Sequence, residues 1–214
     1  FLRVMNERPL AYTPGDSTIY SDWDLMLTGW IVERITGSSL AGFLEERVWS
    51  SLAMRDTGFR PDSAHLERIA PTEIDTLRGG LVHGFVHDEN AWALGGVAGH
   101  AGLFSSARDL ARFAYFMLDG GAPLLHGETV ARWTARQNAG SSRALGWDTP
   151  APRSSAGRFF SPRAFGHTGF TGTSIWIDPE KGLFVVLLTN RVNPTRDNPK
   201  HIALRRAVAD AVQQ

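Results

Sequence analysis

The 214-residue sequence lacks cysteine altogether and contains only two lysines, Lys181 and Lys200. The absence of cysteine excludes disulfides, a thiolate nucleophile and cysteine-based zinc sites. Lysine plus arginine and aspartate plus glutamate number 22 each, and no basic run occurs, so a nucleic-acid partner is not predicted. No apolar run approaches the length of a membrane span, and no transmembrane segment is predicted within these residues.

The residues that are present suffice for a sizeable core, because 43% of them are hydrophobic and 10% are aromatic. Their pattern predicts an α+β fold. A helical, loop-rich region over residues 1–140 is followed over residues 141–214 by an antiparallel sheet and a covering C-terminal helix. Both regions are predicted to belong to one domain, whose site can lie in the cleft between them.

Two runs near the C-terminus, Ala164–Asp178 and Leu183–Asn190, are rich in β-branched and aromatic residues. They predict a two-strand hairpin whose second strand is apolar on both faces and therefore central. The first run opens with glycines and small polar residues, which weaken a strand and are tolerated where a ligand must come close. Residues His167–Gly172 are thus predicted to form one wall of a binding site.

A helix is predicted to begin after Ser21, which is a good N-cap, with Asp22 and Asp24 at the positive end of the helix dipole. Gly37 supplies its end, and Tyr20 is held immediately before its N-terminus. Further helices are predicted after Ser39, after Ser106, over Thr129–Gln137 and from Asn198-Pro199. The predicted buried stripes are Trp23, Leu27, Trp30 and Ile31 in the first helix and Leu204, Ala207, Val208, Ala211 and Val212 in the last, with Trp49 and Trp133 also in the core.

The irregular stretch from Met54 to Ala101 is long enough to predict a functional loop. Its residues His83, His87, Asp88, Glu89 and His100 are of metal-ligating types, but the segment does not read as a helix, so no metal is predicted. The His87–Asn90 loop is instead expected to hold the cleft wall through hydrogen bonds, and it could contact substrate. Gly95–Gly102 is not a dinucleotide fingerprint, because no βαβ unit surrounds it, and no cofactor is predicted.

Two short motifs resemble those of the serine β-lactamase, penicillin-binding-protein and esterase superfamily. Tyr20-Ser21-Asp22 is similar to its Tyr-x-Asn or Tyr-x-Asp element, and His167-Thr168-Gly169 to its Lys/His-Thr-Gly element. Each triplet alone is weak evidence, but their order and separation strengthen it. The surrounding phrases Tyr20–Gly37, Gly102–Phe113, His87–Ala91 and Gly95–Gly102 also resemble the class C-like branch of these serine hydrolases.

The resemblance implies acyl-enzyme chemistry, in which a Ser attacks an acyl carbon, a Lys and a Tyr relay its proton, and water deacylates the enzyme. It implies that Tyr20 relays the proton and that Asp22 orients the Lys or the acyl side chain. His167 stands where many relatives have Lys, and since His titrates near neutrality, activity is expected to fall as pH rises. Thr168, Gly169 and Phe170 are the implied substrate-binding residues, with the Phe170 N–H, on the strand just after Gly169, as oxyanion donor.

Each of these residues also has a plainer interpretation. Tyr20 alone could be a partly buried aromatic beside a helix cap, and Asp22 alone a first-turn residue that suits the helix dipole. His167 alone could be an ordinary strand histidine and Thr168 a β-former. The surrounding motifs favour the functional interpretation.

The sequence departs from the resembled family because it contains no Ser-x-x-Lys, since neither lysine lies three residues after a serine, and no Gly-x-Ser-x-Gly. The first hypothesis is therefore that the sequence is the C-terminal portion of a hydrolase that acts on an ester, a β-lactam or a D-Ala peptide. This portion is expected to be inactive as given and to have an unpaired sheet edge. The second is a catalytically dead homologue that binds peptidoglycan-like or acyl ligands. The resemblance implies a bacterial, periplasmic or otherwise extracytoplasmic protein, and leaves substrate class and oligomeric state open.

Overall fold

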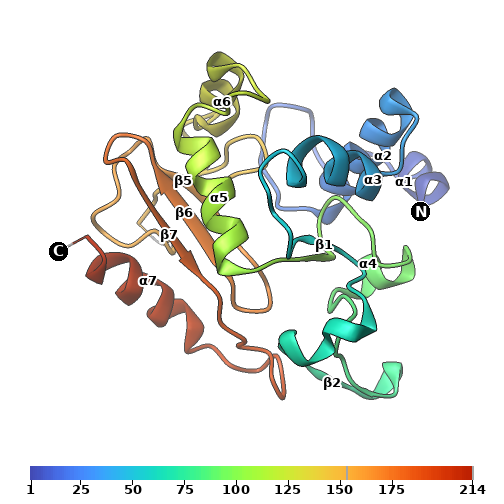
Figure 1. Cartoon of the computed structure of the whole chain (residues 1–214). Coiled ribbons are helices and arrows are strands. Elements are labelled where there is room, and N and C mark those ends of the chain that lie inside the picture. The colour runs from blue at the N-terminus through green and yellow to red at the C-terminus, as the bar shows by residue number, and fades with distance from the viewer. Residues whose placement is uncertain (153, 214) are drawn as a thin grey trace.

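The computed structural model describes residues 1–152 and 154–213 and has a three-stranded antiparallel sheet between helices (Figure 1). Its strand order is β5 (Phe165–Thr168), β6 (Ser174–Asp178), β7 (Leu183–Leu187). Successive residues of β6 point to opposite faces. Ile177 packs with α5 (Ala107–Leu118), whereas Trp176 packs with α7 (His201–Ala211). The predicted α+β class and the covering helix are therefore confirmed.

The rest of the chain consists of short elements beside the sheet. The helices are α1 (Leu2–Glu7), α2 (Asp22–Thr36), α3 (Leu40–Leu44) with a π-helical continuation (Glu45–Trp49), α4 (Glu89–Ala93), α6 (Gly127–Thr134) and two 3₁₀ turns (Ser63–Arg68 and Thr76–Arg78). The strands are β1 (Gly58–Phe59) paired with β4 (Leu103–Phe104), and β2 (Ile74–Asp75) paired with β3 (Gly80–Leu81). The Met54–Ala101 stretch is thus mostly irregular, as predicted.

The predicted first strand, Ala164–Asp178, is instead two strands joined by a turn. Gly169 and Gly172 form this turn, because the Gly169 N–H bonds to the Thr173 carbonyl and Gly172 has φ +120°. A Cβ at Gly172 would also lie 2.7 Å from Thr189 Oγ1. Consequently β6 is central and β7, which was predicted to be central, is an edge of this sheet. Phe170 lies in the turn and not on a strand, which corrects its predicted position.

Helix α2 has the predicted ends but a different buried face. Ser21 Oγ accepts from the Trp23 N–H at 3.2 Å, and Gly37 has φ +69°. The buried residues are Met26 and Gly29, whereas Ile31 of the predicted stripe is 55% exposed. The reason is the close approach of a glycine-rich loop, since a Cβ at Gly99 would lie 2.1 Å from the Leu25 carbonyl oxygen.

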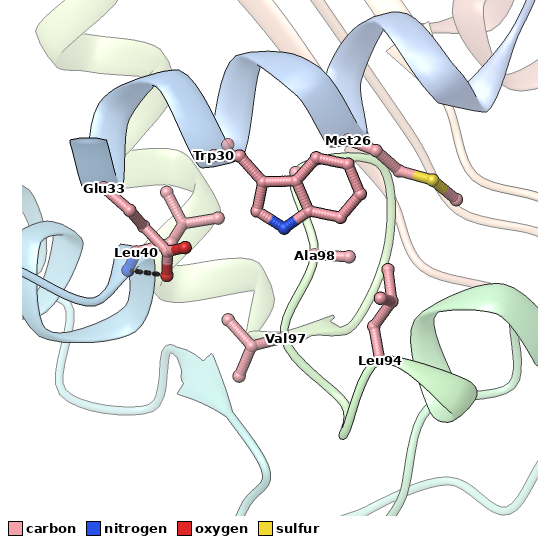
Figure 2. Close-up of a pocket in the computed structure, with 9 residues that line it drawn as sticks. Met26, Trp30, Glu33, Leu40, Leu94, Val97 and Ala98 are labelled. Atoms are coloured by element: carbon pink, nitrogen blue, oxygen red, sulfur yellow. Dashed lines mark hydrogen bonds between the residues drawn. The ribbon is translucent and has the colours of Figure 1, made fainter. Parts of the chain in front are cut away.

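Figure 2 shows this packing, with Met26 and Trp30 of α2 facing Leu94 and Ala98 of the loop. Glu33 closes the corner between α2 and α3, because its Oε1 accepts from the Leu40 N–H at 2.8 Å. The space enclosed here is about 20 Å³, room for about one water. It is a packing gap, too small for a substrate.

Helix α7 also buries a face other than the predicted one. Leu204 and Val212 are 45% and 52% exposed, whereas Arg205 and Ala209 are buried. Arg205 turns inward because its Nη2 donates to the carbonyls of Gly169 and Thr173, both at 2.7 Å. Among the predicted core tryptophans, Trp49 is buried, Trp23 and Trp30 are half-buried, and Trp133 is 47% exposed.

Candidate active site

The structure brings together the two residues on which the sequence argument depended most, Tyr20 and His167. Their ring centroids lie 6.2 Å apart with an interplanar angle of 23°. Tyr20 is held by the N-cap residue Ser21 that follows it, and His167 by the pairing of β5 with Ile175 of β6. Tyr20 as a whole is 62% exposed.

The other predicted strand-side residues follow directly on His167. Thr168 ends β5, and Gly169 opens the turn that carries Phe170. Gly169 has no room for a side chain, because a Cβ would lie 2.2 Å from Thr173 Oγ1. The Phe170 carbonyl accepts from Arg191 Nε at 2.7 Å, and the Arg191 Cζ lies 4.1 Å from the Phe170 ring centroid.

Asp22, the first residue of α2, lies beside Asp88 of the His87–Asn90 loop and His100 of the glycine-rich Gly95–Gly102 loop. Asp22, Asp88 and His100 offer ligand atoms within 4.8 Å of one another. Asp88 caps α4 by accepting from the Ala91 N–H at 2.8 Å, and it accepts from His100 Nε2 at 2.9 Å. The His100 bond holds the pKa of Asp88 below its usual value. Asp88 is therefore the N-cap of α4, and its hydrogen bond with His100 helps to fix the position of its carboxylate.

The remaining metal-type residues of the loop point elsewhere. His83 Nε2 donates to the carbonyls of Leu66 and Ile69, and His87 Nε2 lies 2.9 Å from Glu73 Oε2. The His87 ring stacks on Phe170 with centroids 5.6 Å apart. The loop therefore contacts the site wall through His87, while the five residues considered for zinc do not converge on one point.

Sequence reasoning missed Arg143, which contacts both Tyr20 and His167. Arg143 lies in the segment between α6 and β5; its Nη1 is 3.3 Å from His167 Nε2 and its Cζ is 5.0 Å from the Tyr20 ring centroid. Its backbone is tied to β5 through Asp148, which bridges both Arg143 and Gly166. An arginine alone in a polar loop gives no periodic or motif signal, so no sequence feature marked it.

Comparison with known proteins places the chain in a family. The sequence matches the family model described as Beta-lactamase over residues 1–210. The chain belongs to the beta-lactamase family. A relative from Salmonella typhi named "Putative D-alanyl-D-alanine carboxypeptidase" is 38% identical over 220 residues, which cover 93% of this chain and 51% of the relative. This chain thus spans about half the length of the curated relatives it matches.

Solved structures support the same fold. Simvastatin synthase (LovD) from Aspergillus terreus superposes with a TM-score of 0.72 at 20% identity, covering 96% of this chain and 57% of that one. A β-lactamase from Mycobacterium bovis gives a TM-score of 0.69 at 23% identity, covering 94% and 65%. At these identities the likeness shows the β-lactamase/transpeptidase-like fold alone. In the described part of this beta-lactamase-family chain, no helix combines the length and apolar character that crossing a membrane requires.

The groups around His167 and Tyr20 shift the pKa values of both side chains. Burial, and next the Arg143 guanidinium, lower the pKa of His167 below its ordinary value. The His167 ring therefore loses its charge at a lower pH than an ordinary histidine does. Burial and then the Asp22 carboxylate raise the pKa of Tyr20, while Arg143 opposes them. Tyr20 is accordingly a neutral phenol at neutral pH.

Proposed function

We propose that this chain carries the tyrosine and histidine part of a serine hydrolase that forms an acyl-enzyme with an ester, a β-lactam or a D-Ala peptide. The observation that carries the proposal is the 6.2 Å stacking of Tyr20 on His167, with Asp22 one residue beyond the helix cap. Family membership supports this reaction class. The names of the Salmonella relatives favour a peptide ending in D-alanine among the three substrate classes.

In the proposed reaction the serine oxygen bonds to the acyl carbon, and its proton passes through a lysine and Tyr20 to the departing group. The Phe170 N–H, in the turn after Gly169, would donate to the developing oxyanion, and Thr168 and Gly169 would line the acyl donor. Asp22, with Asp88 close by, would attract the lysine ammonium. Water then attacks the ester bond, releases the acid and returns the proton to the serine.

The serine and lysine of this scheme are absent from the 214 residues, which contain no Ser-x-x-Lys. We propose that they belong to a part of the protein outside these residues, and that the chain by itself forms no acyl-enzyme. This assignment is supported by the relatives, which are about twice as long as the part of them that this chain matches. The proposed protein needs no cofactor, because the serine supplies the nucleophile.

The experiment compares the 214-residue chain with the complete gene product that contains it. Both are mixed with a chromogenic ester, a β-lactam and a peptide ending in D-Ala-D-Ala, and the acyl adduct is sought by intact-protein mass spectrometry. We expect an adduct on the complete protein and none on the chain. A complete protein that binds these ligands without turnover, and whose sequence has no Ser-x-x-Lys, would instead be a ligand-binding homologue.

Within the complete protein, Tyr20→Phe should lower the acylation rate roughly 10²- to 10⁴-fold while the unfolding midpoint stays unchanged, since only the hydroxyl is removed. Tyr115→Phe is the matched control, because Tyr115 is 69% exposed on α5. Stopped-flow measurement of the acylation burst checks this. Near-normal acylation by the Tyr20→Phe variant would remove Tyr20 from the proton relay.

A further inference from the structure

The hydrogen bonds of the His167 ring fix its tautomer. Nδ1 lies 3.0 Å from the Thr168 carbonyl oxygen, and a carbonyl can only accept, so Nδ1 carries the hydrogen. Arg143 can only donate, so its Nη1 hydrogen points to the Nε2 lone pair at 3.3 Å. Protonation of Nε2 would break this bond and place two positive charges side by side. The arrangement therefore selects neutral His167.

Arg143 is the fixed positive charge at this position. Its backbone is restrained, because its N–H bonds to Ser141 Oγ at 3.2 Å and its carbonyl accepts from the Gln137 N–H at 3.1 Å. In the described part of the chain it takes part in no ion pair shorter than 4.0 Å. Among the described residues, the Asp148 carboxylate acts on His167 in the direction opposite to Arg143.

Tyr20 also lies against the same guanidinium. The charged groups that act on its hydroxyl are the carboxylates of Asp22, Asp24 and Asp88, which favour the neutral phenol, and Arg143, which favours the phenolate. A proton relay requires a phenol that can give up its proton without a large penalty. The guanidinium, 5.0 Å from the ring centroid, reduces that penalty whatever the pH.

We propose that Arg143 is a positioning residue of the acylation site: it holds His167 by Nε2, lies against the Tyr20 ring, and supplies the permanent positive charge that His167 does not carry. This inference rests on the proposed function as far as the reaction is concerned. The charge assignment itself concerns the 214-residue chain, and can be measured there without any turnover.

The first experiment titrates the chain. The His167 ring is followed by NMR and the Tyr20 phenolate by its absorbance, with Tyr20→Phe identifying the Tyr20 signal. Arg143→Gln should raise both pKa values, and Arg143→Lys should restore both in part. Arg163→Gln is the matched control, because Arg163 is an exposed arginine just before β5, and it should move neither. Unchanged pKa values in a folded Arg143→Gln chain would overturn the proposal.

The second experiment measures acylation by the complete protein. Arg143→Gln should lower the acylation rate roughly 10- to 100-fold and move the rise of the pH profile to higher pH, with partial recovery by Arg143→Lys. A merely structural arginine would instead lower the unfolding midpoint and leave the pH profile in place, and that outcome would overturn the proposal. Absence of any acyl-enzyme from the wild-type protein would refute the proposed function, and the titration would still decide whether Arg143 sets these charges.

Discussion

Glu73 illustrates at the scale of one residue how the site wall is held. Its carboxylate is buried and accepts from Arg196 Nε, from the Arg196 backbone N–H at 3.0 Å, and from His87 Nε2 at 2.9 Å. The Arg196 side chain is the main reason that the pKa of Glu73 falls to about 2. Since His87 stacks on Phe170, the charge of Glu73 indirectly supports the turn of the site.

The depressed pKa makes part of the stability depend on pH. Because the folded pKa, about 2, lies below the unfolded value of 4.5, this contribution is fully present above pH 4.5 and is lost as pH falls toward 2. We expect roughly 1–2 kcal/mol, discounted because Arg196 is partly exposed. Urea unfolding at several acidic pH values checks this.

Glu73→Gln should remove most of that stability at pH 7 and flatten its dependence between pH 4.5 and 2. Glu7→Gln is the control, because its ion pair with Arg3 spans 3.8 Å between exposed side chains. It should change the free energy of unfolding little. Equal losses in the two variants would show that the Glu73 network contributes nothing beyond a surface charge.

At the scale of elements, the position of Tyr20 depends on how α2 meets the glycine-rich loop. Gly99→Ala should lower the stability by several kcal/mol and move α2, because the new Cβ would meet the Leu25 carbonyl oxygen at 2.1 Å. Gly58→Ala in β1 is the control, since nothing lies within 4 Å of a Cβ there. Denaturant unfolding measures the cost, and the Tyr20–His167 stacking can be followed by ring-current shifts. Equal stability of the two variants would contradict this contact.

The ends of α2 could be predicted because they depend on local chemistry. Ser21 can cap only the helix that follows it, and Gly37 takes up a left-handed conformation that other residues avoid. The buried faces of α2 and α7 depend on partners distant in sequence. Gly29 faces inward because a loop backbone approaches it, and Arg205 because two carbonyls of a turn accept its hydrogens. The spacing of apolar residues along the sequence predicts neither of these contacts.

The same distinction applies to the candidate site. Tyr20 and His167 stood out because the residues around them form recognisable phrases, whereas Arg143 has no such phrase and enters the site only through tertiary structure. The turn over residues 169–173 could also not be separated from a strand, because threonine and phenylalanine favour strands and only two glycines interrupt them. The register of β5 against β6, in which Thr168 pairs with Ser174, shows that residues 169–173 connect the two strands.

At the scale of the whole molecule, the sheet and the helical region expose apolar surface. In the described residues β7 pairs with β6 on one side only. A groove of about 300 Å³ also lies between α2, α3 and the loop after Ala98, lined mainly by apolar side chains, among them Leu25, Val32, Leu44, Phe59 and Leu103. An unpaired strand beside exposed apolar residues is a template for association with another chain.

We therefore expect the 214-residue chain to self-associate with rising concentration. Leu188, directly after β7, is 41% exposed, so Leu188→Lys should weaken association by placing a charge at the strand end without disturbing the core. Leu204→Lys is the control, because Leu204 is 45% exposed but belongs to α7 and not to β7. Sedimentation velocity over a concentration series measures both variants. If both weaken association equally, general surface hydrophobicity and not the β7 edge drives it; a chain that stays monomeric throughout contradicts the expectation altogether.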